Sequence, residues 1–94
     1  MGQVNQVRGR ATAIYTEGDT TKVIYHGTPV VSFNQDKISL DTGGWFTMTT
    51  KLRMNQAAHQ FNLGYAVIQK KGLWFIHFKG EIIPYENSLM TLTR

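Results

Sequence analysis

TTKLRMNQAAHQFN, residues 49–62, is the one stretch of this chain in which apolar residues recur with the period of a helix. At about 100° per residue, these side chains form a stripe along one face. The other side is polar and rich in amides, apart from Leu52. A helix of this kind buries its apolar stripe against another element, which we expect to be a sheet. The stripe consists of Met54, Ala57, Ala58 and Phe61.

The residues at either end of this stretch predict where the helix begins and ends. Thr49 or Thr50 can act as the N-cap, because a threonine hydroxyl accepts a hydrogen bond from a backbone N–H of the first turn. Gly64 stands where a left-handed C-terminal cap is expected. We therefore predict one helix over residues 50–62.

Upstream of the helix, the sequence predicts a meander of four strands. Short β-favouring runs alternate with segments containing Gly, Asp and Asn, which suit turns. The first ten residues show no such period and carry Arg8 and Arg10. We expect residues 1–10 to be a flexible basic arm ahead of a single domain over residues 11–94. The four runs cover residues 11–15, 21–25, 30–33 and 37–40.

Downstream of the helix, the clearest feature is a hairpin. Its two runs, residues 65–69 and 73–78, are joined through Lys70-Lys71-Gly72, where glycine can take a positive φ. Pro84 then predicts that the next short strand lies at a sheet edge, because proline cannot donate to a ladder. A last short strand is expected within residues 89–92.

Alternation along the second run of the hairpin divides its side chains between two faces. Leu73 and Phe75 lie on a face that we expect to stay partly open. Such a face on a small cysteine-free domain predicts self-association, most simply as a homodimer. The other face is expected to join Phe61 in the core, and it carries Trp74, Ile76 and Phe78.

These elements predict an α+β fold, with one antiparallel sheet of five to seven strands and the helix packed on one face. A small β-barrel closed by the helix is the alternative. With 41% hydrophobic residues, 94 residues are enough for one core and too few for two. The absence of cysteine excludes a disulfide framework, a thiolate zinc site and a cysteine nucleophile. Because the sequence has no signal-peptide or membrane-spanning run, we expect a cytoplasmic protein with no membrane partner.

Charge is distributed unevenly along the chain. Between Thr42 and Lys79 there are five basic residues and no acidic one, whereas the remainder carries five basic and six acidic residues. A basic face attracts phosphates, and aromatic residues beside it can stack unpaired bases. A solvated surface that keeps the domain soluble accounts for the same pattern. The candidate residues are Lys51, Arg53, Lys70 and Lys71, with Trp45 nearby.

The segment TGGWFTMTTKLR, residues 42–53, is the second candidate feature. Its glycines and hydroxyls precede the predicted helix start, where backbone N–H groups and the helix dipole favour an anion. The spacing matches neither a P-loop nor a dinucleotide-binding fingerprint. A tight turn followed by a capping threonine accounts for the same pattern. The candidate phosphate-binding residues here are Gly43, Gly44, Thr49 and Thr50.

Other side chains give weaker signals. The polar helix face could read base edges in a major groove through its amides Asn55, Gln56, Gln60 and Asn62, which lie close to His59. No helix-turn-helix or zinc-finger pattern accompanies them, and contact with a protein partner accounts for the same face. The three histidines are far apart in sequence, and no carboxylate stands at a ligand-like spacing, so we expect no metal and no cofactor. No motif for a catalytic nucleophile is present, and we expect the protein not to be an enzyme.

Several short motifs together resemble a known group of proteins. With TPVV at residues 28–31, TGGW at 42–45, TTKLRMNQ at 49–56 and KGLWF at 71–75, the sequence resembles small uncharacterised proteins encoded by bacteriophages and related mobile elements. The resemblance extends over residues 27–75. It implies a phage context, in which accessory proteins of this size often bind nucleic acid or inhibit a host or defence protein.

Two functions follow as expectations. The first is binding of nucleic acid, with single strands favoured, or of another phosphate-bearing ligand through the basic face. The alternative is a protein-targeting inhibitor of a host or defence system, as an anti-CRISPR protein is. Charge favours the first function, and the phage context favours either.

Overall fold

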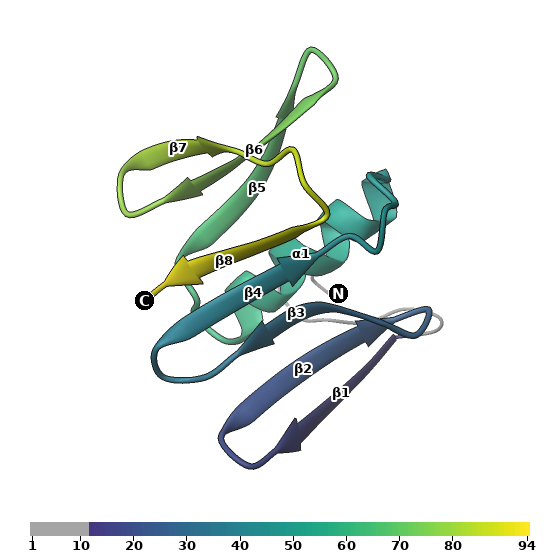
Figure 1. The fold of residues 1–94 in the computed structure, drawn as a ribbon, viewed down its shortest axis with the longest axis vertical. Coiled ribbons are helices and arrows are strands. Elements are labelled where there is room, and N and C mark those ends of the chain that lie inside the picture. Colours follow the sequence, from purple (N-terminus) through teal and green to yellow (C-terminus); the bar gives the residue numbers. More distant parts are fainter. Residues whose placement is uncertain (1–11) are drawn as a thin grey trace, which may run out of the picture.

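The computed structural model describes residues 12–94, which form eight strands and one helix (Figure 1). The α+β class is confirmed, but the strands form two antiparallel sheets instead of one, in the orders β1-β2-β3-β4-β8 and β5-β6-β7. The predicted arm, residues 1–10, and Ala11 lie outside the described residues. The elements are β1 (Thr12–Glu17), β2 (Thr20–Tyr25), β3 (Thr28–Phe33), β4 (Lys37–Asp41), α1 (Met48–Gln60), β5 (Tyr65–Lys70), β6 (Leu73–Phe78), β7 (Glu81–Pro84) and β8 (Leu89–Thr93).

Two-residue turns join four of the hairpins, and three of these turns have the same backbone conformation. In His26-Gly27, Lys71-Gly72 and Lys79-Gly80 both residues have a positive φ. This backbone matches the twist of the flanking strands, and glycine adopts it at no steric cost. The turn at Gly72 was predicted from the sequence, whereas no turn was predicted at His26-Gly27 between the runs of residues 21–25 and 30–33. As a result, β3 begins at Thr28, two residues before the predicted run.

The helix begins and ends two residues earlier than predicted. Its N-cap is Thr47, whose Oγ1 accepts from the backbone N–H of Thr50 (3.2 Å). At the other end Asn62, and not Gly64, takes the left-handed cap position, with φ of 55°. The backbone N–H of Leu63 donates to the carbonyl of Ala58 (2.9 Å), which completes a Schellman-type end.

The division into two sheets follows from a contact between the helix and β5. Helix α1 packs against β2 and β3, and it also contacts β5. Asn55 Nδ2 donates to the carbonyl of Val67 (3.0 Å), and the backbone N–H of Val67 donates to Asn55 Oδ1 (2.7 Å). The side chain of Asn55 thus pairs the backbone N–H and C=O of Val67 on the side of β5 that faces away from β6. Figure 1 shows α1 behind the five-stranded sheet, with the β5–β6 hairpin projecting away from it.

The core combines side chains from both sheets and from the helix. Trp74, Ile76 and Phe78 are buried, as the alternation predicts. The prediction was wrong for Phe61, which is only half-buried and stacks on Phe33 at 4.9 Å between ring centroids. The other buried apolar residues are Val23, Val30, Val31, Ile38, Leu40, Met54, Ala57, Ala58, Leu63, Tyr65, Val67, Tyr85 and Leu92.

Candidate functional site

A glycine turn leads from β4 into α1. Gly43 and Gly44 have φ of 66° and 89°. The N–H of Gly43 donates to Asp41 Oδ1 (2.8 Å). The N–H of Gly44 donates to Thr42 Oγ1 (3.1 Å). Because a Cβ at Gly43 would lie 2.9 Å from Thr28 Oγ1, glycine at this position lets the connection pack closely on β3.

Two consecutive aromatic residues after this turn have opposite surroundings. Phe46 packs edge-on against Trp74 and Tyr85, with ring centroids 5.0 and 5.7 Å away. Trp45 is 70% exposed, although its backbone N–H donates to the carbonyl of Thr42 (3.1 Å). The connection therefore holds the indole of Trp45 at the surface on an anchored backbone.

A pocket of about 280 Å³ lies between the β2–β3 turn, this connection and the first turn of α1. Tyr25, His26 and Trp45 supply aromatic walls, and the buried Val30 supplies an apolar one. Tyr25 and His26 are themselves in edge-on contact at 4.5 Å. The pocket also has a hydroxyl-rich lining, made by Thr28, Thr42, Thr47 and Thr50.

The two predicted capping threonines are not free anion ligands. Thr50 is buried, and its Oγ1 lies 2.9 Å from Thr47 Oγ1, so its hydroxyl belongs to the helix cap. Thr49 is half-buried and does not line the pocket. Thr47 takes the N-cap position that was expected of Thr49 or Thr50, whereas Thr42 lies in the turn after β4 and accepts from the N–H of Gly44.

Lys51 and Arg53 point to opposite sides of the helix, because two residues of an α-helix are about 200° apart. Arg53 Nε donates to Thr12 Oγ1 (3.2 Å). Its guanidinium lies 5.6 Å from the ring centroid of Tyr25, a wall of the pocket. Lys51 Nζ donates to Gln69 Oε1 (3.2 Å), at the end of β5. The fold thus separates the two helix cations that the sequence placed on one surface.

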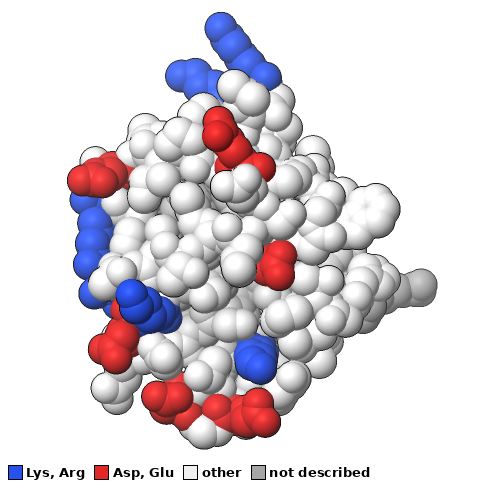
Figure 2. Space-filling model, viewed as in Figure 1, with Lys and Arg blue, Asp and Glu red and all other residues white. Residues whose placement is uncertain are grey.

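Through its contact with Gln69, Lys51 lies next to Lys70 and Lys71 at the tip of the β5–β6 hairpin. Lys70 ends β5 and Lys71 opens the turn, and both side chains are exposed. The hairpin stands clear of the rest of the fold in Figure 1, and basic side chains project at the same end in Figure 2. Of the predicted site residues, the structure gathers Lys51, Lys70 and Lys71 at one end. It places Arg53 beside the pocket that Trp45 lines.

A family model described as the Kyanoviridae Gp96 protein matches residues 3–92, nearly the whole chain. The chain belongs to the Kyanoviridae Gp96 family. The phage context that the sequence motifs implied is thereby confirmed. Comparisons with curated proteins and with solved structures gave no match.

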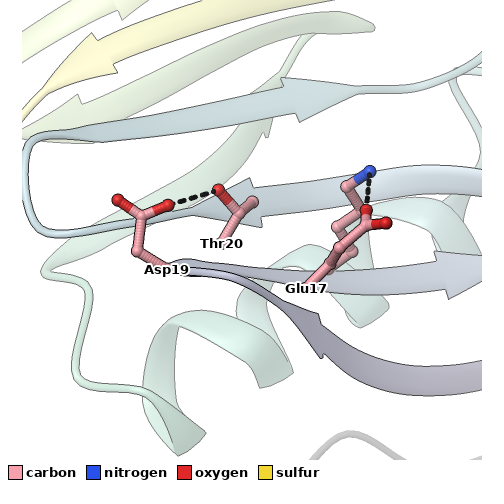
Figure 3. Close-up of polar contacts among 4 residues, drawn as sticks. Glu17, Asp19 and Thr20 are labelled. Atoms are coloured by element: carbon pink, nitrogen blue, oxygen red, sulfur yellow. Dashed lines mark hydrogen bonds and ion pairs between the residues drawn. The ribbon is translucent and has the colours of Figure 1, made fainter.

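The cations of the candidate site form no ion pair with a carboxylate of residues 12–94 in this Gp96 family protein, although Asp41 accepts from the N–H of Gly43. The ion pair found among residues 12–94 joins Lys22 and Glu17 (3.7 Å), in the β1–β2 hairpin (Figure 3). Asp19, in the same hairpin, contacts the hydroxyl of Thr20 (3.3 Å). Within the described part of the chain, no carboxylate forms an ion pair with a cation of the segment from Thr42 to Lys79. Figure 2 shows acidic and basic groups interspersed elsewhere on the face in view.

Two tyrosines near the site are held in the neutral state. Burial raises the pKa of Tyr65, whose hydroxyl donates to the carbonyl of Met54 (2.6 Å). Burial also raises the pKa of Tyr85, and the negative charge of Asp41 adds to that effect. Both therefore serve as hydrogen-bond donors, and Tyr85 donates to the carbonyl of Ser88 (2.8 Å).

Two of the four amides on the helix face are not available to read base edges. Asn55 is committed to the backbone of β5, and Gln56 is buried, accepting from Arg53 Nη1 (3.1 Å). Gln60, which ends the helix, and Asn62, just beyond it, are exposed. Among residues 12–94, no group of three His, Asp or Glu side chains is arranged to hold a metal. No helix in that range has both the length and the apolar content to cross a bilayer.

Proposed function

We propose that this protein binds single-stranded nucleic acid through the phosphate backbone. The binding surface, called the basic surface below, consists of Lys51, Arg53, Lys70 and Lys71. A strand would run from the tip of the β5–β6 hairpin, across the exposed side of the first turns of α1, to the pocket beside Trp45. Lys51 borders this side of the helix on the hairpin side, and Arg53 borders it on the pocket side.

The observation that carries the proposal is that these cations lack carboxylate partners among residues 12–94. A lysine or arginine without an ion pair keeps its full attraction for phosphate, and release of counterions from the nucleic acid supplies most of the affinity. Three of the four cations gather around one projecting hairpin, where a flexible backbone can contact them together. Trp45 adds an exposed aromatic surface at the other end of the path.

A fluorescence anisotropy titration with a labelled single-stranded oligonucleotide tests this proposal. At about 50 mM salt we expect the triple variant Lys51→Ala/Lys70→Ala/Lys71→Ala to lose at least about tenfold in affinity, because several phosphate contacts are removed. The matched control is Lys37→Ala, since Lys37 is also exposed but lies on β4 in the five-stranded sheet. The proposal fails if the wild-type protein does not bind, or if both variants bind as the wild type does.

An apolar groove supports inhibition of a host or defence protein as the second candidate function. The groove has a volume of about 350 Å³ and lies among Phe46, Leu73, Phe75 and Pro84. Leu73 is 63% exposed, and an exposed apolar side chain beside a groove is a common anchor in protein interfaces. A protein that copurifies with the wild-type chain from infected cells at high salt, but not with Leu73→Asp, would favour this function.

A further inference from the structure

We propose that the pocket at the start of α1 receives one unpaired nucleobase of the bound strand. This inference rests on the proposed function and adds a base-recognition site to its phosphate contacts. The pocket volume of about 280 Å³ is near the lower end of the range for small-molecule sites, roughly 300–1,000 Å³. A single flat ring system suits a site of this size.

Trp45 presents its indole at the surface beside the pocket. The other tryptophan, Trp74, is 6% exposed and packs in the core, whereas Trp45 is 70% exposed. Its backbone is held by Thr42, and the neighbouring ring of Phe46 is anchored against Trp74. An indole on a fixed support offers a flat surface for a base without loss of backbone freedom on binding.

Two hydroxyl groups in the wall of the pocket, those of Thr42 and Thr28, have unused hydrogen-bonding capacity. Thr42 is 2% exposed, and its Oγ1 accepts from Gly44, but no acceptor for its own proton is found in the part of the chain that the structure describes. Thr28, which is half-buried, likewise forms no hydrogen bond through Oγ1 within residues 12–94. Buried polar groups such as the Thr42 hydroxyl are normally paired. Because hydroxyls both donate and accept, these two can pair with the polar edge of a base.

Arg53 lies beside Tyr25, one of the aromatic residues that line the pocket. Its guanidinium lies over the ring of Tyr25, and Nε and Nη1 donate to Thr12 and Gln56. Nη2 has no hydrogen-bond partner within the described residues, so it is available to a phosphate. A nucleotide with its base in the pocket would carry its phosphate near this nitrogen.

The test compares an oligonucleotide with an abasic strand of the same length and charge. We expect the wild-type protein to bind the base-bearing strand at least about fivefold more tightly, because each stacked base adds affinity that the abasic strand cannot supply. The double variant Trp45→Ala/Thr28→Val should bring this ratio close to one while retaining the salt dependence of binding. The control Ile82→Ala, an exposed apolar residue of β7 that lies outside the pocket, should leave the ratio unchanged.

The outcomes separate the pocket from the basic surface. The base-site proposal is overturned if the wild type binds the two strands with equal affinity, or if the double variant keeps the wild-type ratio of the two affinities. Either result leaves phosphate binding in place. Failure of both strands to bind at about 50 mM salt overturns the proposed function and the base site together. Thermal unfolding of the double variant confirms that it is folded, and Thr28→Val alone, which preserves side-chain shape, should lower the ratio if the double variant is unstable.

Discussion

At the scale of single residues, glycine and tyrosine positions carry constraints that composition does not reveal. Gly43 combines a positive φ with close packing on Thr28. Tyr65 combines burial with a hydrogen bond to the helix backbone. The sequence predicted the turn at Gly43, because paired glycines favour turns. It could not predict the contact with Thr28, which joins segments far apart along the chain.

Replacement of Gly43 by alanine should lower the free energy of unfolding by about 1–3 kcal/mol, since a Cβ is strained at this φ and would collide with Thr28. Gly44→Ala is the matched control, because its φ of 89° is equally unfavourable but its Cβ would meet open space. Urea denaturation measures both changes. Equal losses in the two variants would show that the contact with Thr28 contributes nothing.

The buried Tyr65 should make stability fall at alkaline pH. Its pKa is raised in the folded state above the ordinary value of about 10, so this contribution is complete below pH ~10 and is lost as the pH rises further. One such group changes the free energy of unfolding by about 1.4 kcal/mol per pH unit in that range. Tyr65→Phe should decline less steeply than the wild type in urea denaturation between pH 9 and 11. Parallel curves for the two proteins would contradict this assignment.

At the scale of elements, the local sequence pattern predicted whether a segment is a helix or a strand better than it predicted where that element ends or which other element it packs against. The alternation in β6 gave its bounds and its buried face, because both depend on neighbouring residues. The helix caps are Thr47 and Asn62 and not the predicted Thr49 or Thr50 and Gly64. Several adjacent residues can act as a cap, and the path of the chain selects one of them. The second sheet could not be predicted, since it depends on the contact of Asn55 with β5.

Loss of the Asn55 side chain should destabilise the protein by about 2–3 kcal/mol, because the backbone N–H and C=O of Val67 lose their partners together. His59→Ala, an exposed change on the same helix, should have little effect. In Asn55→Ala, amide hydrogen exchange at Val67 should accelerate, while exchange in the five-stranded sheet changes only as far as global stability does. Unchanged protection at Val67 would show that Asn55 does not hold β5.

At the scale of the whole molecule, the sequence indicated the charge but not its arrangement. The acid-free segment was visible in the sequence, and its cations have no ion-pair partner among residues 12–94. Lys51 faces the hairpin and Arg53 faces the pocket, because the helical period turns them to opposite sides of α1 and because β5 packs beside one of those sides. The position of β5 depends on tertiary packing, which the sequence pattern does not show. The pocket joins residues from the β2–β3 turn, the connection after β4 and the helix, so no single stretch could reveal it.

The predicted homodimer stays a prediction, for which sedimentation at high micromolar concentration is the measurement.

The salt dependence of oligonucleotide affinity tests the central claim most directly. If the four cations of the basic surface each contact a phosphate, the logarithm of affinity should fall with the logarithm of salt concentration at a slope of about −3, roughly 0.7 per contact. Anisotropy titrations of a labelled single strand between about 50 and 200 mM salt give this slope. The account predicts a slope near −3 that becomes shallower by about 2 in the triple lysine variant. A slope near zero, or no binding at the lowest salt, would contradict it.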